Sequence, residues 1–268
     1  MGQTLAVLIL ALANLFMLLL LTRLLFWSPV QNLSAANFDV YLINMDKNRN
    51  RLEHFKKMYA KTDLASKPFI RFEAINGKAL GDGVYNSVSP RIRLGLDHYE
   101  QTGERVGYAQ MTPGMIGCYL SHYAIYEKIW DSRVDFGIIF EDDANISKNI
   151  YSKVIRHVAE DDGKFPRDWD VILLGHICRQ CEDATPYYKT PKYFWGLHGY
   201  MVSRKGAKAL LDNQEPAISM QIDHYIGALG RAGLLNIYAL HPAWVGTVNF
   251  GSDLQTVVTP NAPSDQLW

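Results

Sequence analysis

The sequence predicts an α/β fold with a mainly parallel sheet that is covered by helices on both faces. Short apolar segments rich in β-branched and aromatic residues alternate with longer segments of helical periodicity. Parallel strands need crossover connections, and helices usually supply them. With 268 residues and no internal repeat, the chain is long enough for one large domain or two small ones.

The amino-terminal part differs in composition from the rest. Residues 5–22 carry no charge, Arg23 follows them, and Trp27 ends an apolar segment that is long enough to cross a bilayer. A cleaved signal peptide is the alternative, but no Lys or Arg precedes the run, and the run exceeds the usual signal length. We therefore predict a transmembrane signal anchor over residues 1–27, a short stem over residues 28–37 and a globular domain over residues 38–268.

An amino-terminal anchor predicts a single-pass type II membrane protein, with the globular domain on the lumenal side of the ER or Golgi if the source is eukaryotic. Sequons at Asn32 and Asn145 are compatible with a lumenal glycoprotein. The 27 basic and 27 acidic residues balance and form no polybasic run, which argues against nucleic acid as a partner. Cys178 and Cys181 form a C-x-x-C pair without a second pair for a structural zinc site, so we expect a local disulfide or two unpaired thiols. Cys118 lies in an apolar stretch and is expected to be a buried small hydrophobe.

The first half of the globular domain reads as strand, helix, strand and loop. Residues 38–43 are β-branched and aromatic and predict a strand, and a charged helix is expected over residues 48–61. A second strand over residues 69–74 stops at an Asn-Gly pair. Residues 78–110 are polar and Gly-rich without a period, which is typical of a functional loop or lid.

The second half returns to regular structure. Thr112 is a plausible N-cap and Pro113 suits the first position of an amphipathic helix that runs to about Trp130. The remaining expected elements are a strand over residues 136–141, a helix near residues 149–160, a strand over residues 169–175 and a helix over residues 204–212.

Three adjacent acids, Glu141, Asp142 and Asp143, end the apolar strand over residues 136–141. Ligands of open α/β sheets bind outside the carboxyl ends of the strands. Adjacent carboxylates repel one another unless a cation or hydrogen bonds offset the repulsion. Mg²⁺ and Mn²⁺ prefer carboxylate oxygens and often link them to phosphates. The acids therefore predict a metal–diphosphate site, and a solvated acidic turn is the alternative.

Several segments together resemble glycosyltransferase family 25, which includes lipooligosaccharide galactosyltransferases of bacteria and collagen hydroxylysine galactosyltransferases of animals. The resemblance covers roughly residues 38–258, and its segments are residues 40–46, 72–77, 111–122, 139–143, 199–207, 221–225 and 251–253. The family often has Asp where this chain has Asn76, and Pro-Val where it has Gln221-Ile222. The second departure concerns the acceptor pocket, and neither removes an acid with an expected catalytic role.

The resemblance implies a GT-A type fold, in which a Rossmann-like sheet binds a nucleotide sugar, here preceded by the transmembrane helix. It implies transfer of a hexose with inversion, expected to be galactose from UDP-galactose. The expected acceptor is a glycan, a lipid-linked saccharide such as lipooligosaccharide, or a protein hydroxylysine, and the expected cofactor is Mn²⁺ or Mg²⁺.

An inverting transfer needs a cation for the departing diphosphate and a base for the acceptor hydroxyl. We expect Glu141, Asp143 and His241 to bind the metal. Asp223 stands among semi-apolar residues, which suits a general base, although an Asp at a helix start is a common structural alternative. The residues expected to bind the nucleotide sugar are Asp46, Arg49, Arg51, Gly117, Ser121, His122 and Asp142.

Two other functions compete with this interpretation. Another metal-dependent nucleotide-using enzyme, such as a nucleotidyltransferase, also places acids at a strand tip. A binding protein built on a transferase fold that has lost its activity is the second alternative, because fold does not determine function. Cation-dependent release of a free nucleotide distinguishes an active enzyme from such a binding protein.

Overall fold

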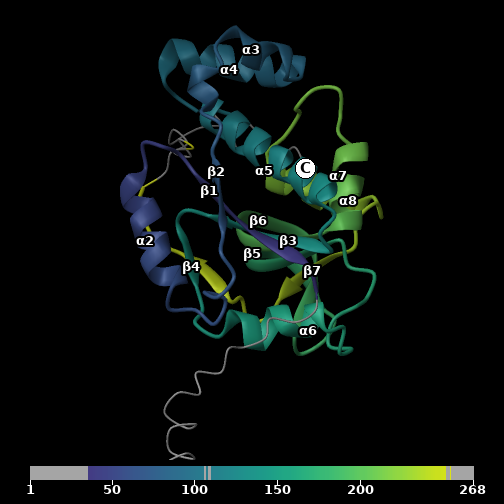
Figure 1. The fold of residues 1–268 in the computed structure, drawn as a ribbon. Coiled ribbons are helices and arrows are strands. Elements are labelled where there is room, and N and C mark those ends of the chain that lie inside the picture. The colour runs from purple at the N-terminus through teal and green to yellow at the C-terminus, as the bar shows by residue number, and fades with distance from the viewer. Residues whose placement is uncertain (1–35, 106, 108–109, 252–253, 255–268) are drawn as a thin grey trace, which may run out of the picture. The chain divides into compact units, whose positions relative to one another are not determined.

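A six-stranded sheet forms the centre of the computed structural model, which describes residues 36–105, 107, 110–251 and 254 (Figure 1). The strand order is β2-β1-β3-β6-β5-β7. The strands are β1 (Phe38–Asn44), β2 (Ile70–Glu73), β3 (Phe136–Glu141), β5 (Val171–Asp183), β6 (Tyr188–Ser203) and β7 (Ile237–Leu240). Parallel pairing joins β1 to β2 and β3, and β5 to β7, whereas β6 runs antiparallel to its neighbours. The predicted mainly parallel α/β sheet is therefore confirmed, with β6 as its antiparallel member.

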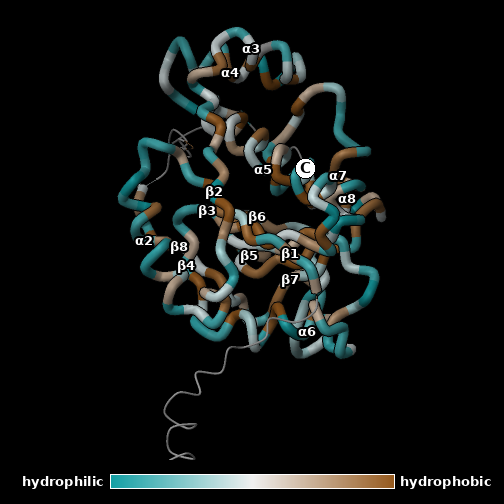
Figure 2. Tube along the Cα trace, viewed as in Figure 1, coloured by the Kyte–Doolittle hydropathy of each residue, from teal (hydrophilic) through white to brown (hydrophobic). Residues whose placement is uncertain are grey.

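Helices cover both faces of this sheet. Figure 1 shows α5, α7 and α8 on one side of the sheet and α6 on the other. The strand residues between them are almost continuously buried, as expected for strands without a solvated face, and Figure 2 shows hydrophobic residues gathered along the central strands. The helices are α2 (Arg49–Tyr59), α3 (Asp82–Asn86), α4 (Pro90–Thr102), α5 (Pro113–Ser132), α6 (Arg156–Ala159), α7 (Arg204–Asp212) and α8 (Ile222–Arg231), with short turns at η1 (Gly77–Ala79) and η2 (Tyr151–Ile155).

Capping residues explain where two of the predicted helices begin. The Thr112 side chain accepts a hydrogen bond from the backbone N–H of Met115, and Pro113 occupies the first turn of α5. Ser203 likewise accepts from the N–H of Gly206 at the start of α7. Both helix starts that the sequence predicted are confirmed.

Residues 78–110 are not a structureless loop, because α3 and α4 lie within them. Helix α4 is bounded by local signals: Ser89 accepts from the backbone N–H of Ile92, Pro90 follows, and Gly103 ends the helix in the left-handed conformation with φ of 72°. These signals are present in the sequence, but the weak apolar period of the segment obscured them.

The long β5–β6 hairpin is a feature that the sequence reasoning did not predict. Both strands run past the sheet edge, and their register shifts at several bulges. Cys178 and Cys181 lie in this extension and form a disulfide, the first of the two alternatives expected for them. The hairpin bends so that Tyr188 and Lys189, at the start of β6, pair with β7.

A second, two-stranded sheet holds the loop that carries the acids. Strand β4 (Ala144–Ile146) pairs antiparallel with β8 (Val245–Thr247), and the backbone N–H of Val248 donates to the carbonyl of Asp143 at 2.7 Å. The chain that follows β8 is therefore brought beside the carboxyl end of β3.

The localisation prediction, a single-pass type II membrane protein, is contradicted. Within the described part of the chain, no helix is both long and apolar enough to cross a membrane. The anchor predicted over residues 1–27, and all but the last two residues of the stem predicted over residues 28–37, lie outside the described residues.

Candidate functional site

A pocket of about 260 Å³ opens at the carboxyl ends of β1, β2 and β3, near the lower end of the size range for small-molecule sites. This is the edge where α/β sheets bind ligands. Its lining comes from the ends of these strands, from α5 and from the chain after β8, and includes Asn44, Arg51, Cys118, His122, Glu141, Asp142, Asp143 and Gly251. The structure therefore gathers the three adjacent acids with several of the residues expected to bind a nucleotide sugar.

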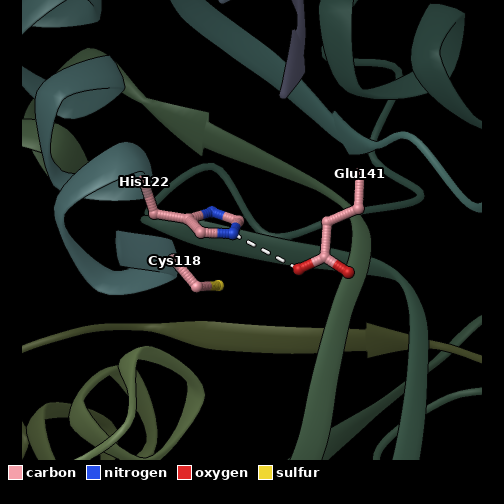
Figure 3. Close-up of side chains that lie close together, drawn as sticks. All are labelled: Cys118, His122 and Glu141. Carbon is pink, nitrogen blue, oxygen red and sulfur yellow. Dashed lines mark hydrogen bonds and ion pairs between the residues drawn. The ribbon is translucent and has the colours of Figure 1, made fainter. Parts of the chain in front are cut away.

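Glu141 lies between two histidines. Its Oε1 is 3.3 Å from Nε2 of His122, and its Oε2 is 4.0 Å from Nδ1 of His198 (Figure 3 shows the His122 contact). Burial alone would raise the pKa of Glu141, but the two imidazoles outweigh it and lower that pKa to about 2. Glu141 is therefore a carboxylate at neutral pH.

Asp142 is held by partners within the protein. Its Oδ1 accepts a hydrogen bond from the Arg51 guanidinium at 2.9 Å, and its Oδ2 accepts one from the Asn44 amide at 2.7 Å. Arg51 also donates to the carbonyl of Gly251 at 2.6 Å, so one guanidinium joins α2, the tip of β3 and the chain after β8. Both oxygens of Asp142 accept hydrogen bonds within the protein, and its expected role in binding the nucleotide sugar stays a prediction.

Asp143 has the opposite environment. Its Oδ1 is buried and has no hydrogen-bond partner among the described residues. Burial, followed by the charge of Glu141, raises the pKa of Asp143 to about 6. A buried carboxylate without a donor is costly unless a ligand supplies the missing interaction.

His198 completes a group of side chains that could hold a cation, and the sequence did not predict this residue. One ligand atom from each of Glu141, Asp143 and His198 lies within 4.8 Å of the other two. Burial alone would lower the pKa of His198, but Glu141, then the charges of Asp143 and Asp223, outweigh it and raise that pKa. The orphaned oxygen and the mixture of two carboxylates and one imidazole fit a divalent cation.

Asp223 lies in the first turn of α8, close enough to His198 for its charge to act there. Its Oδ2 accepts a hydrogen bond from the backbone N–H of Gly196 at 3.0 Å, and its Oδ1 accepts one from the N–H of His224 at 2.8 Å. These bonds fix the carboxylate beside strand β6, two residues from His198. Helix start and candidate base are compatible roles for the same residue.

Ser121 and Gly117 hold the pocket wall together. The Ser121 hydroxyl accepts from the N–H of Ile75 at 2.8 Å and donates to the carbonyl of Gly117 at 2.6 Å, inside α5. A Cβ on Gly117 would lie 2.3 Å from the Ile75 carbonyl oxygen and 2.6 Å from the Gly77 nitrogen. The loop after β2 can therefore pack on α5 only because this position is glycine.

The other expected site residues lie further out. Asp46 is exposed and forms an ion pair with Arg71 at 2.6 Å, and Arg49 is exposed at the start of α2. Neither of the two lines the pocket described above. His241 is exposed, its N–H donates to the carbonyl of Tyr187, and it belongs to neither group of described residues that could hold a metal ion.

Comparison with known proteins identifies relatives of the same kind as the sequence resemblance. Residues 37–226 match the family model described as "Glycosyltransferase family 25 (LPS biosynthesis protein)". A "Glycosyltransferase 25 family member" of Anopheles gambiae is 28% identical over 204 residues, covering 74% of this chain and 32% of the relative. "Procollagen galactosyltransferase 1-A" of Xenopus laevis is 26% identical, covering 76% of this chain and 33% of the relative.

The relatives also include one named as lacking activity. "Probable inactive glycosyltransferase 25 family member 3" of Bos taurus is 24% identical over 205 residues, covering 74% of this chain and 33% of that protein. This chain spans about a third of the length of these curated relatives. The similarity therefore concerns one part of larger proteins.

Proposed function

The chain belongs to glycosyltransferase family 25, and we propose that residues 38–268 form a GT-A type catalytic domain that transfers a hexose from a nucleotide sugar to an acceptor hydroxyl. One observation carries the proposal: Glu141 and Asp143 line the pocket at the sheet edge and group with His198, and Asp223 is close enough for its charge to act on His198 and on Cys118 of the pocket wall. A leaving diphosphate needs a nearby positive charge, and an incoming hydroxyl needs a base to take its proton. The cation group can supply the first and Asp223 the second.

The residues that would hold a divalent cation are Glu141, Asp143 and His198. When bound, such an ion offsets the negative charge that develops on the departing diphosphate. Imidazole nitrogen is a poor ligand for Mg²⁺, which prefers oxygen, so the donor set favours Mn²⁺. The buried Oδ1 of Asp143, which has no hydrogen-bond partner among the residues that the structure describes, supports this assignment, because an ion would satisfy it.

The pocket lining supports a nucleotide as the ligand. Arg51 and Asn44 hold Asp142 at its wall, and Ser121 holds the adjacent loop after β2, so the wall is fixed before a ligand arrives. The name of the Xenopus laevis procollagen galactosyltransferase favours galactose as the transferred hexose, and we take UDP-galactose as its donor from the family resemblance.

Asp223 is the proposed general base. The backbone N–H of Gly196 orients its carboxylate beside the strand that carries His198. In the transfer, Asp223 takes the proton of the acceptor hydroxyl, the acceptor oxygen bonds to the anomeric carbon, and the bond to the diphosphate breaks with release of UDP. Attack from the side opposite the diphosphate inverts the anomeric centre.

The names of two animal relatives contain the word procollagen, and the family resemblance implies hydroxylysine as one possible acceptor. We take a hydroxylysine side chain as the acceptor, and a glycan or lipid-linked saccharide as the competing outcome. A binding protein without activity is the other competing outcome, which the bovine relative named as probably inactive exemplifies.

The test is release of UDP from UDP-galactose by the purified chain, with Mn²⁺ or with a chelator, and with hydroxylysine-containing peptide or saccharide acceptors. The proposal expects release that needs Mn²⁺ and rises with one acceptor class. Asp143→Asn and Asp223→Asn should each lower it by about 10²-fold or more in folded protein. Transfer at the wild-type rate by either variant contradicts the role given to that residue.

A further inference from the structure

Glu141 belongs to a second group of metal-binding side chains in the same pocket. Cys118, His122 and Glu141 each offer one ligand atom, and the three atoms lie within 4.8 Å of one another. All three residues line the pocket. Cys118 and His122 are four residues apart on α5 and therefore share one helix face, and Figure 3 shows both side chains directed toward Glu141.

The donor atoms of this second group differ from those of the first. It offers a sulfur, a nitrogen and an oxygen, and thiolate sulfur selects soft or borderline ions such as Zn²⁺ over Mn²⁺ or Mg²⁺. A thiolate and a carboxylate together balance the charge of a divalent ion. Three protein ligands leave a fourth tetrahedral position open toward the pocket.

The contacts behind His122 suit a metal ligand. Its Nδ1 lies 2.7 Å from the hydroxyl of Tyr200, which in turn lies 2.8 Å from the hydroxyl of Tyr126. Metal-bound histidines usually donate their other ring N–H to such a partner, which fixes the ring and its tautomer. When a metal ion replaces the proton on Nε2, Nδ1–H would donate to Tyr200 and the lone pair of Nε2 would bind the ion beside Glu141.

From these contacts we infer that Cys118, His122 and Oε1 of Glu141 form a binding site for one thiophilic divalent ion of the Zn²⁺ class, separate from the group of Glu141, Asp143 and His198. Binding forms a sulfur–metal bond and releases the thiol proton of Cys118 to solvent. This site goes beyond the proposed function, and binding of the Zn²⁺-class ion does not depend on transferase activity.

The two sites share one carboxylate but use different oxygens, because His122 lies by Oε1 and His198 by Oε2. One negative charge then serves two dications, and the dications repel each other. Zn²⁺ in the thiol site therefore weakens Mn²⁺ binding at the other. Only the resulting inhibition of transfer rests on the proposed function.

The test uses Co²⁺, a spectroscopic substitute for Zn²⁺, with the full chain kept free of reductant. The chain has three cysteines, and two are in the disulfide, so Cys118 is its only thiol. We expect a thiolate-to-Co²⁺ charge-transfer band in the near ultraviolet that Zn²⁺ abolishes. Cys118→Ser should lose the band, and the matched variant His198→Ala should keep it.

If the folded wild-type chain shows no charge-transfer band with Co²⁺, the inference is wrong. This outcome does not depend on whether Cys118→Ser folds, because Cys118 is the only thiol that could give the band. A band that persists in folded Cys118→Ser also overturns it. For the coupling, electron paramagnetic resonance of free Mn²⁺ should show that Zn²⁺ weakens Mn²⁺ binding more in wild type than in Cys118→Ser. Equal weakening contradicts the shared carboxylate. These readouts need no transfer activity, so a failed transfer assay leaves them interpretable.

Discussion

Replacing Asp143 by Asn should stabilise the metal-free protein at neutral pH. Oδ1 of Asp143 is buried and has no hydrogen-bond partner in the described part of the chain, and burial together with Glu141 raises the pKa of Asp143 from the usual 3.8 to about 6. A carboxyl with a raised pKa in the folded state makes folding less favourable as pH rises from about 4 to about 6, and the loss is complete above that window. Asparagine has no charge to bury and removes the repulsion from Glu141.

The magnitude follows from the pKa. A rise of about two units corresponds to roughly 3 kcal/mol, at about 1.4 kcal/mol per unit, and the partial exposure of Asp143 screens part of it. We therefore expect Asp143→Asn to raise the free energy of unfolding by about 1–3 kcal/mol near pH 7.5 in a chelator. Near pH 4 the two proteins should differ little, because Asp143 is then protonated in the folded state.

The assay is urea denaturation of both proteins in a chelator at the two pH values, repeated with Mn²⁺ at pH 7.5. Asp142→Asn is the matched control, since it removes the adjacent carboxylate. That change removes the ion pair between Asp142 and the part-buried Arg51 guanidinium and leaves one oxygen for both Arg51 and the Asn44 amide, so it should cost about 1–3 kcal/mol. Mn²⁺ should stabilise wild type and not Asp143→Asn.

A loss of stability in Asp143→Asn without metal would refute this reasoning. So would an equal gain at both pH values, because the effect would then not come from the charge of Asp143. Equal effects of the two substitutions would mean that the adjacent acids are not divided into one held by hydrogen bonds within the protein and one that binds a metal.

Three further predictions concern the pocket wall and the base. Ser121→Ala leaves the part-buried N–H of Ile75 without its side-chain acceptor and should lower the free energy of unfolding by about 1 kcal/mol in urea denaturation; an unchanged value would show that water replaces the hydroxyl. Gly117→Ala places a Cβ 2.3 Å from a backbone oxygen and should lower stability by at least about 1–3 kcal/mol, with a lower midpoint in the same assay. Asp223→Asn leaves one oxygen for the two backbone N–H groups of Gly196 and His224, so the free energy of unfolding should fall by about 1 kcal/mol while transfer falls by about 10²–10⁴-fold; wild-type transfer would exclude Asp223 as the base.

Local sequence signals were sufficient for the parts of the fold that depend on neighbouring residues. The buried strand over residues 136–141 and the helix that begins at Pro113 follow from composition and capping alone. The acid cluster at a strand end likewise predicted the edge of the sheet where the pocket lies. Helix α4 shows the limit, because its cap and terminal glycine were visible but its apolar period was weak.

Pairing between strands that are distant in the sequence determines the part of the site that the sequence did not predict. His198 joins Glu141 and Asp143 only because β6 pairs antiparallel with β3, with Phe140 opposite Gly199. No local sequence pattern predicts strand β6, because its outer half is bulged and partly exposed. The three adjacent acids look alike in the sequence, and Arg51, which lies on α2, distinguishes Asp142 from Asp143.

The most direct test of the account is whether UDP-galactose binding by the full chain depends on Mn²⁺ and on Asp143. Thermal melts would be recorded for wild type and Asp143→Asn, with the nucleotide sugar, in Mn²⁺ and in a chelator. A ligand at a hundred times its dissociation constant adds about 2.7 kcal/mol of stability. We expect UDP-galactose to raise the melting temperature of wild type in Mn²⁺ and not in the chelator. The same shift in the chelator or in Asp143→Asn, or no shift in folded wild type, would contradict it.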